Sequence, residues 1–198
     1  MTHWRIVPAL PSHIPCIAAH MRDADRREVW ASHRHTPEEA LRTSLDYAEI
    51  NRAWTCLLSV GFFSSGKEVK ADRGGVDSSV HDSPDCCGLT PHDGKSPAEM
   101  VPAFMWGVSR TGSILSTTAT PWLLGTDAIR LVARDFLRHS RGYVYEMQRG
   151  FERLENYVHA ENVLSRRWLI WCGFTIEMNA PVFFNGEVFY PFWREGDV

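Results

Sequence analysis

Apolar residues recur at steps of three and four along several segments of the chain, and this spacing predicts helices. The longest run extends from Asp127 to Met147, where Gly142 either kinks or ends the helix. Shorter helices are predicted over 13–21, 23–32, 35–50 and 162–172. Side chains typical of N-caps precede or begin these helices, namely Ser12, Asp23 or Asp25, Thr36 and Asn162. Gly173 suits the left-handed position that ends the last helix, where Phe174 packs back on Leu169.

Seven apolar or alternating segments predict strands, over 4–10, 52–63, 102–110, 114–126, 152–158, 174–184 and 187–194. Pro121 lies within the fourth of these segments and predicts a bulge or an edge position there. The last two strands are joined by Asn185 and Gly186, a pair that favours a tight hairpin. The order of helices and strands therefore predicts an α/β fold, a sandwich built on a mixed sheet.

The composition changes abruptly over residues 64–97, which are rich in Gly, Ser, Asp and Pro and almost free of large apolar residues. This segment is predicted to be a polar surface insertion between the second and third strands. Apart from it, the length favours a single domain over residues 1–198.

Charge and cysteine content exclude several classes of protein. A net charge of −3 argues against a broad surface for nucleic acid or anionic membrane. Four arginines spaced about one helical turn apart predict a solvated helix face, at positions Arg130, Arg134, Arg138 and Arg141. No secretory signal or membrane span is evident. The five cysteines are odd in number and unpatterned, as expected of a reduced intracellular protein.

A group of potential zinc ligands lies inside the polar insertion, comprising His81, Cys86, Cys87 and His92. Adjacent cysteines are awkward ligands for one tetrahedral ion, and the spacing matches no standard zinc knuckle. A solvated loop is the simpler interpretation, so no metal site is predicted.

The stretch "NYVHAENVLSRRWLIWCGFTI" (residues 156–176) and the order of the elements resemble the GCN5-related N-acetyltransferase (GNAT) family. That resemblance implies about seven strands, about four helices and a splayed fourth and fifth strand pair. The chain is more similar still to small GNAT-like proteins of short-tailed bacteriophages, some of which are internal virion or assembly proteins. The tract "PWLLGTDAI" (residues 121–129), followed by a long helix, adds to that similarity.

The resemblance implies where acetyl-CoA would bind. Its thioester arm would lie between the fourth and fifth strands, and its pyrophosphate would meet backbone N–H groups that open the long helix. The residues that match these positions are Leu124, Gly125, Thr126, Ala128, Arg130 and Asn162. The usual loop pattern Q/R-x-x-G-x-G/A is degraded here to "GTDAIR", and Asp127 would repel a phosphate. Thr126, Asp127 and Asn162 also have a simpler interpretation as N-caps.

Catalytic groups are less evident in the sequence. Many enzymes of this family carry a tyrosine four residues before the glycine, where it protonates the leaving thiolate, but this chain has Leu169 there. Candidate general bases are Asp25, Glu28, Glu99 and His159, of which Glu28 or His159 could relay a proton through water. Residues of these types are more often ordinary surface charges or hydrogen-bonded turn residues than catalytic groups.

Two functions from different classes follow. The first is a bacteriophage protein with a degenerate acyl-CoA site, located in the host cytoplasm or within the virion, that acts in assembly by contacting other virion proteins. The second is an active acetyl-CoA-dependent N-acyltransferase that acts on an amine of a protein or small molecule. A host-directed phage factor is a third possibility. The sequence does not identify the acyl acceptor.

Overall fold

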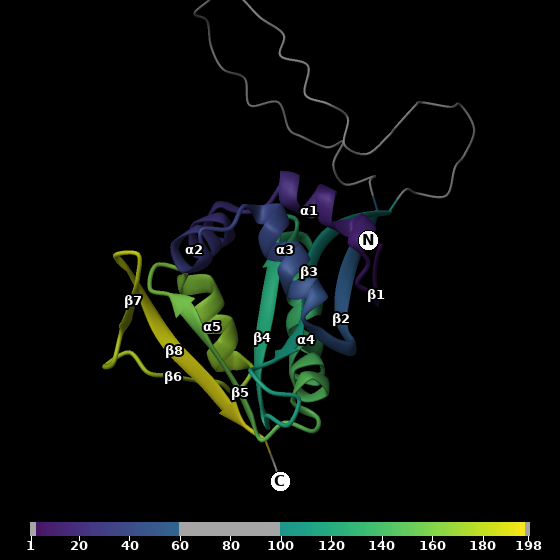
Figure 1. Cartoon of the computed structure of the whole chain (residues 1–198). Coiled ribbons are helices and arrows are strands. Elements are labelled where there is room, and N and C mark those ends of the chain that lie inside the picture. Colours follow the sequence, from purple (N-terminus) through teal and green to yellow (C-terminus); the bar gives the residue numbers. More distant parts are fainter. Residues whose placement is uncertain (1–2, 60–99, 197–198) are drawn as a thin grey trace, which may run out of the picture.

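The computed structural model describes residues 3–59 and 100–196 (Figure 1). The helical elements are η1 (Pro11–His13), α1 (Ile14–Ala19), α2 (Asp23–His33), α3 (Pro37–Asp46), α4 (Ile129–Gln148) and α5 (Val163–Trp171). The strands are β1 (Trp4–Pro8), β2 (Ala48–Ser59), β3 (Met100–Arg110), β4 (Thr118–Gly125), β5 (Arg153–His159), β6 (Thr175–Ile176), β7 (Val182–Phe184) and β8 (Glu187–Glu195).

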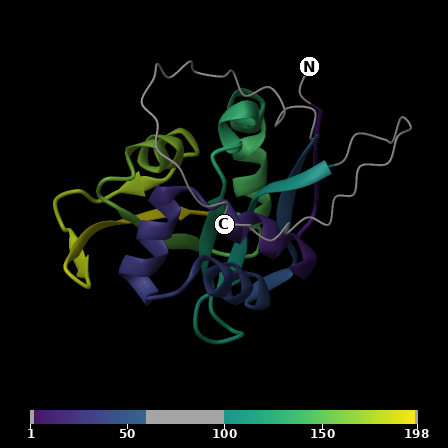
Figure 2. The same ribbon diagram turned by 90° about the horizontal axis from the view of Figure 1, so that it is seen from above.

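The strands form one mixed sheet in the order β1-β2-β3-β4-β5-β8-β6, with β7 also paired to β8. Every neighbouring pair is antiparallel except β4 and β5, which are parallel. Helices cover both faces: α1, α2 and α3 lie on one side and α4 and α5 on the other (Figure 2). The predicted α/β sandwich is therefore confirmed.

Each helical layer packs its own apolar cluster against the sheet. On the α4 and α5 face, Trp106, Phe136 and Leu154 belong to the larger cluster and are buried. On the opposite face, Ile17 of α1 and Leu41 of α3 pack in a smaller one. Because strand side chains alternate between faces, neighbouring residues of β3 such as Met105 and Trp106 contribute to different clusters.

The parallel pair β4 and β5 separates soon after it forms. Only Thr118 with Arg153 and Ala119 with Leu154 are in register, and beyond them the two strands diverge toward their carboxyl ends (Figure 1). The expected splayed fourth and fifth strand pair is thus confirmed. At the narrow end, one side chain spans the gap: the Asn156 Nδ2 donates to the Pro121 carbonyl at 2.9 Å.

Several boundaries differ from the sequence predictions at the start of the chain. The helix predicted over 13–21 is shorter, and Ser12 lies inside η1 without capping it. Helix α2 follows Arg22, and neither Asp23 nor Asp25 caps it, because the Asp25 carboxylate is directed to the β4 backbone instead. Capping of α3 by Thr36 is confirmed, with its hydroxyl accepting the Glu39 N–H.

Helix α3 was expected to continue to Ile50, but it ends at Asp46 and β2 begins at Ala48. Pairing of Ala48 with Ser109 of β3 outweighs the local helical pattern, and the register shift that follows accommodates Asn51 at a φ of 60°. The long helix α4 begins two residues later than expected, with Ala128 in the N-cap position, and passes through Gly142 without ending.

Two strand predictions also change, and the alternatives at Pro121 are decided. The fourth strand begins at Thr118 rather than at 114. Pro121 pairs in continuous register with Val108, so there is no bulge, and it lies beyond Ala119, where pairing with β5 ends, in keeping with the edge alternative. The segment 174–184 forms two short strands, β6 and β7, which brings the sheet to eight strands. The hairpin at Asn185 and Gly186 is confirmed, both residues having positive φ.

The predicted insertion at 64–97 lies outside the described residues, as do Glu99 and the group His81, Cys86, Cys87 and His92. The insertion and the single-domain division therefore remain predictions. In the part of the chain that is described, no helix is long and apolar enough to span a membrane. The arginines at 130, 134, 138 and 141 are all exposed on α4, as the helical spacing predicted.

Candidate functional site

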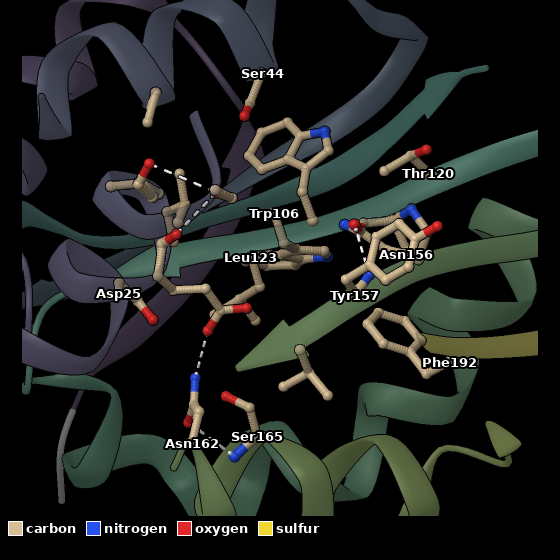
Figure 3. Close-up of a pocket in the computed structure, with 18 of the residues that line it drawn as sticks. Asp25, Ser44, Trp106, Thr120, Leu123, Asn156, Tyr157, Asn162, Ser165 and Phe192 are labelled. Carbon is tan, nitrogen blue, oxygen red and sulfur yellow. Dashed lines mark hydrogen bonds between the residues drawn. The ribbon is translucent and has the colours of Figure 1, made fainter. Parts of the chain in front are cut away.

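A cavity of about 570 Å³ occupies the space where β4 and β5 diverge (Figure 3). Side chains on both faces of the sheet line this cavity. Trp122, which packs in the cluster beneath α1 and α3, lines it on one side, and Trp168 and Leu169 of α5 line it on the other. The cavity therefore crosses the sheet through the opening between the two strands.

The backbone of β4 presents unpaired groups to this opening. In an antiparallel pair, N–H and C=O groups alternate between the partner strand and the opposite side. The N–H of Thr126 bonds to Ala103 of β3, whereas the N–H of Gly125 points away from β3. The same alternation turns the N–H and C=O of Leu123 toward the cavity, where β5 has already separated. A polar ligand lying along the opening would meet both groups.

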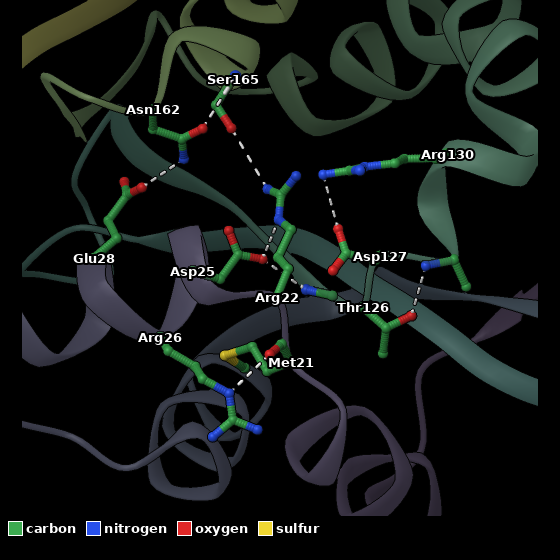
Figure 4. Close-up of polar contacts among 12 residues, drawn as sticks. Met21, Arg22, Asp25, Arg26, Glu28, Thr126, Asp127, Arg130, Asn162 and Ser165 are labelled. Carbon is green, nitrogen blue, oxygen red and sulfur yellow. Dashed lines mark hydrogen bonds and ion pairs between the residues drawn. The ribbon is translucent and has the colours of Figure 1, made fainter. Parts of the chain in front are cut away.

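Asp25 of α2 is buried against the end of β4. Its Oδ2 accepts the Gly125 N–H at 2.9 Å and forms an ion pair with the Arg22 Nε at 2.8 Å. Burial raises the pKa of Asp25, and the Arg22 guanidinium and the Gly125 hydrogen bond oppose that change. The Arg22 Nη2 also donates to the Ser165 hydroxyl at 3.5 Å, which links the residue before α2 to α5 (Figure 4).

Glu28 lies one turn further along α2 and lines the cavity. Its Oε2 accepts a hydrogen bond from the Asn162 side-chain amide at 2.8 Å (Figure 4). Burial raises the pKa of Glu28 to about 7, although the hydrogen bond from Asn162 acts in the opposite direction. A carboxylate whose pKa lies close to neutrality is suited to take a proton from a bound group.

His159, the other predicted catalytic residue, is placed differently. The residue is 3% exposed, and its ring packs edge-on against Phe189 and contacts the Glu187 carboxylate through Nε2 at 3.2 Å. Its Nδ1 accepts the Glu161 N–H at 3.2 Å. The ring therefore does not line the cavity, and only the backbone of His159 interacts with Glu28.

The turn between β4 and α4 contains most of the residues predicted to bind the cofactor. Gly125 is required by packing, since a Cβ there would lie 2.3 Å from the Phe104 Cβ. The N–H of Ala128 bonds to the Thr126 hydroxyl, and the next three N–H groups bond to carbonyls of the same turn. The amides that the resemblance assigns to the pyrophosphate are thus hydrogen-bonded within the chain itself. Arg130 is exposed and paired with Asp127 at 3.1 Å.

On α5, the cavity is lined by residues one turn apart. Asn162 caps the helix by accepting the Ser165 N–H at 3.3 Å, while its amide group holds Glu28. The predicted cap is therefore confirmed, and contact of Asn162 with the arm of a cofactor stays a prediction. Leu169 lies four residues before Gly173, at the position where the resemblance would have placed a tyrosine. Ser165, four residues earlier on the same face of α5, brings a hydroxyl to the cavity.

The structure thus brings together two predicted residues, Glu28 and Asn162, with Leu124 also in the cavity wall. It places Gly125, Thr126, Ala128 and Arg130 at the adjoining turn. Sequence reasoning missed Arg22, Ser165 and Asn156, whose contacts join segments far apart in the chain. No group of three or more potential metal ligands occurs among residues 3–59 and 100–196.

Comparisons with known proteins identify the fold. No family model matches the sequence, and no curated protein matches it. Solved structures do: Ard1 from Thermoplasma volcanium superposes with a TM-score of 0.53 at 12% identity, covering 98% of this chain and 99% of that one. A GCN5-related N-acetyltransferase from Kribbella flavida gives 0.53 at 13% identity, with 98% of each chain covered.

Spermidine N-acetyltransferase from Vibrio cholerae, in complex with CoA and spermine, gives a TM-score of 0.52 at 9% identity. That match covers 97% of this chain and 95% of that one. At these identities the likeness establishes the fold alone. The chain has the GNAT fold.

Proposed function

We propose that this protein is an N-acyltransferase that takes an acyl group from a coenzyme A thioester and transfers it to an amine. The observation that carries this proposal is the cavity between β4 and β5, which crosses the sheet and has Glu28 in its wall. One face of the sheet can then receive the thioester and the other the amine, so that the two meet in the opening.

The opening suits the arm of the donor. That arm contains two amide groups, and Leu123 turns a backbone N–H and C=O toward it. Apolar contact is available from Leu169 and Val158, which also line the cavity. The bridge from Asn156 to the Pro121 carbonyl closes the narrow end and fixes how deep the arm can lie.

The phosphates of the donor require a different binding mode from the usual one. Since the first amides of α4 bond to their own turn, side chains must supply the positive charge. Arg130 lies in the first turn of α4 and is exposed, with Asp127 as its present partner. We assign phosphate binding to Arg130, which exchanges the Asp127 carboxylate for a phosphate oxygen.

Glu28 is assigned the general base. In the transfer, the amine nitrogen forms a C–N bond to the thioester carbon, the C–S bond breaks, and the nitrogen loses its extra proton. Glu28 accepts that proton, directly or through one water, while Asn162 holds its carboxylate in place. The sulfur leaves as thiolate and takes a proton from water. The Ser165 hydroxyl, rather than a tyrosine, is the α5 group that donates a hydrogen bond to it.

The test is calorimetric titration of the full chain with acetyl-CoA, followed by measurement of thiol release with a panel of amines. We expect saturable binding, and amine-dependent release that is lost in Glu28→Gln while acetyl-CoA still binds. An absence of heat at millimolar acetyl-CoA would contradict the proposal.

A second candidate is a bacteriophage virion component or assembly factor that uses the GNAT scaffold for protein contacts. The occupied amides of the β4–α4 turn, together with Asp127 beside them, favour this function because they oppose phosphate binding. Its test is co-sedimentation of the protein with intact particles, together with the calorimetric result. Co-sedimentation without acetyl-CoA binding would favour this candidate over the enzyme.

A further inference from the structure

One half of the cavity extends from the opening between β4 and β5 toward α2 and α3, on the side of the sheet away from α5. It is reached from the side of the sheet on which Trp122 packs, and Ser44 of α3 lies at its edge (Figure 3). Because the donor is assigned to the opening itself, this half is the space left for the acyl acceptor.

The charged side chains in the described wall of this half of the cavity are acidic. The carboxylates of Asp25 and Glu28 line the cavity, and none of the described lining residues is a lysine or an arginine. The nearest guanidinium, that of Arg22, is 11% exposed and already paired with Asp25. His33 lines the wall, but burial and then the neighbouring His35 lower its pKa below the usual 6.5, so at neutral pH it adds no positive charge.

This distribution of charge favours amines that carry no carboxylate over those that do. An ammonium group entering the cavity approaches the Glu28 carboxylate and finds a favourable potential. A substrate carboxylate would enter without a cation to pair with it and would lie near the same Glu28, and an unpaired charge is costly to bury.

The walls of this half are largely aromatic. Trp122 lies across Gly107 of β3, where a Cβ would come within 2.9 Å of the Trp122 Cζ2. Tyr157 and Phe184 meet edge-to-face at 5.1 Å on the opposite wall. All three side chains line the cavity. Aromatic walls favour an aromatic or apolar ligand, and their faces also attract a cation.

We infer that the acyl acceptor is a primary amine carried on an aromatic framework without a carboxylate, as in a small arylalkylamine. The inference rests on the proposed transferase function and names the substrate class of that site. Glu28 takes the proton of the amine, and the aromatic walls hold the ring.

The experiment compares phenethylamine, its carboxylated counterpart phenylalanine, and the aliphatic polyamine spermidine. Turnover with acetyl-CoA is measured at pH 8, where histidine is neutral. Binding of each amine without acetyl-CoA is followed separately by tryptophan fluorescence, since Trp122 lines the site. We expect phenethylamine to exceed phenylalanine in kcat/KM by roughly tenfold or more, given the like charge near Glu28. Spermidine is expected to be poorer than phenethylamine.

A charge placed in the wall tests the electrostatic cause. Ser44 is half-buried on α3 beside the cavity, so Ser44→Arg introduces a cation there, and Ser44→Gln introduces a neutral side chain in the same position. We expect Ser44→Arg to shift the ratio of phenylalanine to phenethylamine by about tenfold in favour of phenylalanine. Ser44→Gln should leave that ratio unchanged.

The outcomes separate the two proposals. If acetyl-CoA binds but phenylalanine or spermidine is used as well as phenethylamine, the acceptor class is wrong and the transferase function stands. Acetyl-CoA binding with no response to any of the three amines in turnover or fluorescence also overturns the acceptor class. If acetyl-CoA does not bind, the transferase function falls, and the acceptor assignment falls with it.

Discussion

Glu28 of α2 and Asn162 of α5 are joined by a hydrogen bond of 2.8 Å across 134 positions of sequence. Asn162 also caps its own helix, so the same side chain fixes the start of α5 and the carboxylate of Glu28. Three residues earlier on α2, Asp25 binds the Gly125 N–H of β4. Helix α2 thus connects both sides of the opening between β4 and β5, and the first predictions concern its two carboxylates.

Replacing Glu28 by Gln removes the proposed base while keeping a hydrogen-bonding side chain of the same size. We expect kcat/KM for amine acylation to fall roughly a hundredfold or more, the usual contribution of general base catalysis. Acetyl-CoA affinity, measured by calorimetry, should stay close to that of the wild type. Glu161→Gln is the control, because Glu161 is exposed and pairs with Arg27. Equal losses in both variants would rule out a special role for Glu28.

The pH dependence of the rate follows from the pKa of Glu28, which burial raises to about 7. A general base acts in its deprotonated form, so kcat/KM should rise with pH through about 7 and then level off. The measurement is a pH profile of thiol release at low amine concentration. A profile without a step between pH 6 and pH 8, roughly the range around that pKa, would contradict the assignment.

Stability should depend on pH through the same group. The pKa of Glu28 is raised from 4.5 to about 7 in the folded protein, so the folded state holds more protons between these values. The free energy of unfolding therefore falls as pH rises through that window, by about 3 kcal/mol from this residue, and stays lower above it. Denaturant unfolding of Glu28→Gln should lack this part of the decline. Parallel curves for the two proteins would show that Glu28 is not the cause.

Asp25 is expected to be structural. Replacement by Ala leaves the buried Arg22 guanidinium and the Gly125 N–H without their partner, which should cost about 3–5 kcal/mol of stability. Asp135→Ala is the matched control, because its ion pair with Arg138 is exposed and should contribute less than about 0.5 kcal/mol. Urea unfolding monitored by tryptophan fluorescence measures both. Similar midpoints for the two variants would contradict the proposed contact with β4.

Two glycines provide a test of whether the β4–α4 turn is shaped by packing or by a ligand. A Cβ on Gly125 would overlap Phe104, so Gly125→Ala should destabilise the fold by about 2 kcal/mol or more even without acetyl-CoA. Gly142 has open space around it within α4, and Gly142→Ala should stabilise the protein by about 0.5–1 kcal/mol. An unchanged stability in Gly125→Ala would indicate that the glycine serves a ligand instead.

Arg130 and Asp127 should have opposite effects on acetyl-CoA binding. Arg130→Ala removes the proposed phosphate contact and should weaken binding about tenfold. Asp127→Asn removes the competing carboxylate and should strengthen binding by roughly threefold. Arg138→Ala, two turns along α4, is the control. Weaker binding in Asp127→Asn would show that the carboxylate helps to shape the site.

The sequence determined most of the local structure of this protein, because local structure depends on residues close together in the chain. The Thr36 cap, the Asn162 cap with Gly173 after it, and the Asn185–Gly186 hairpin all form within a few residues. Where local and distant preferences differed, as at Ala48, strand pairing with β3 decided the outcome. Periodicity alone could not show that, since it carries no information on the partner strand.

The site was decided by tertiary structure. Glu28 and Asn162 were recognised as candidates separately, but their contact spans 134 positions, and that of Asp25 with Gly125 spans 100. The alternation of β4 that exposes Leu123 also depends on where β5 separates from it. Burial, and with it a pKa of about 7 for Glu28, exists only once α2 has packed over the opening. The physical reason is that desolvation and hydrogen bonding between distant segments act through space, and the order of residues records them only indirectly.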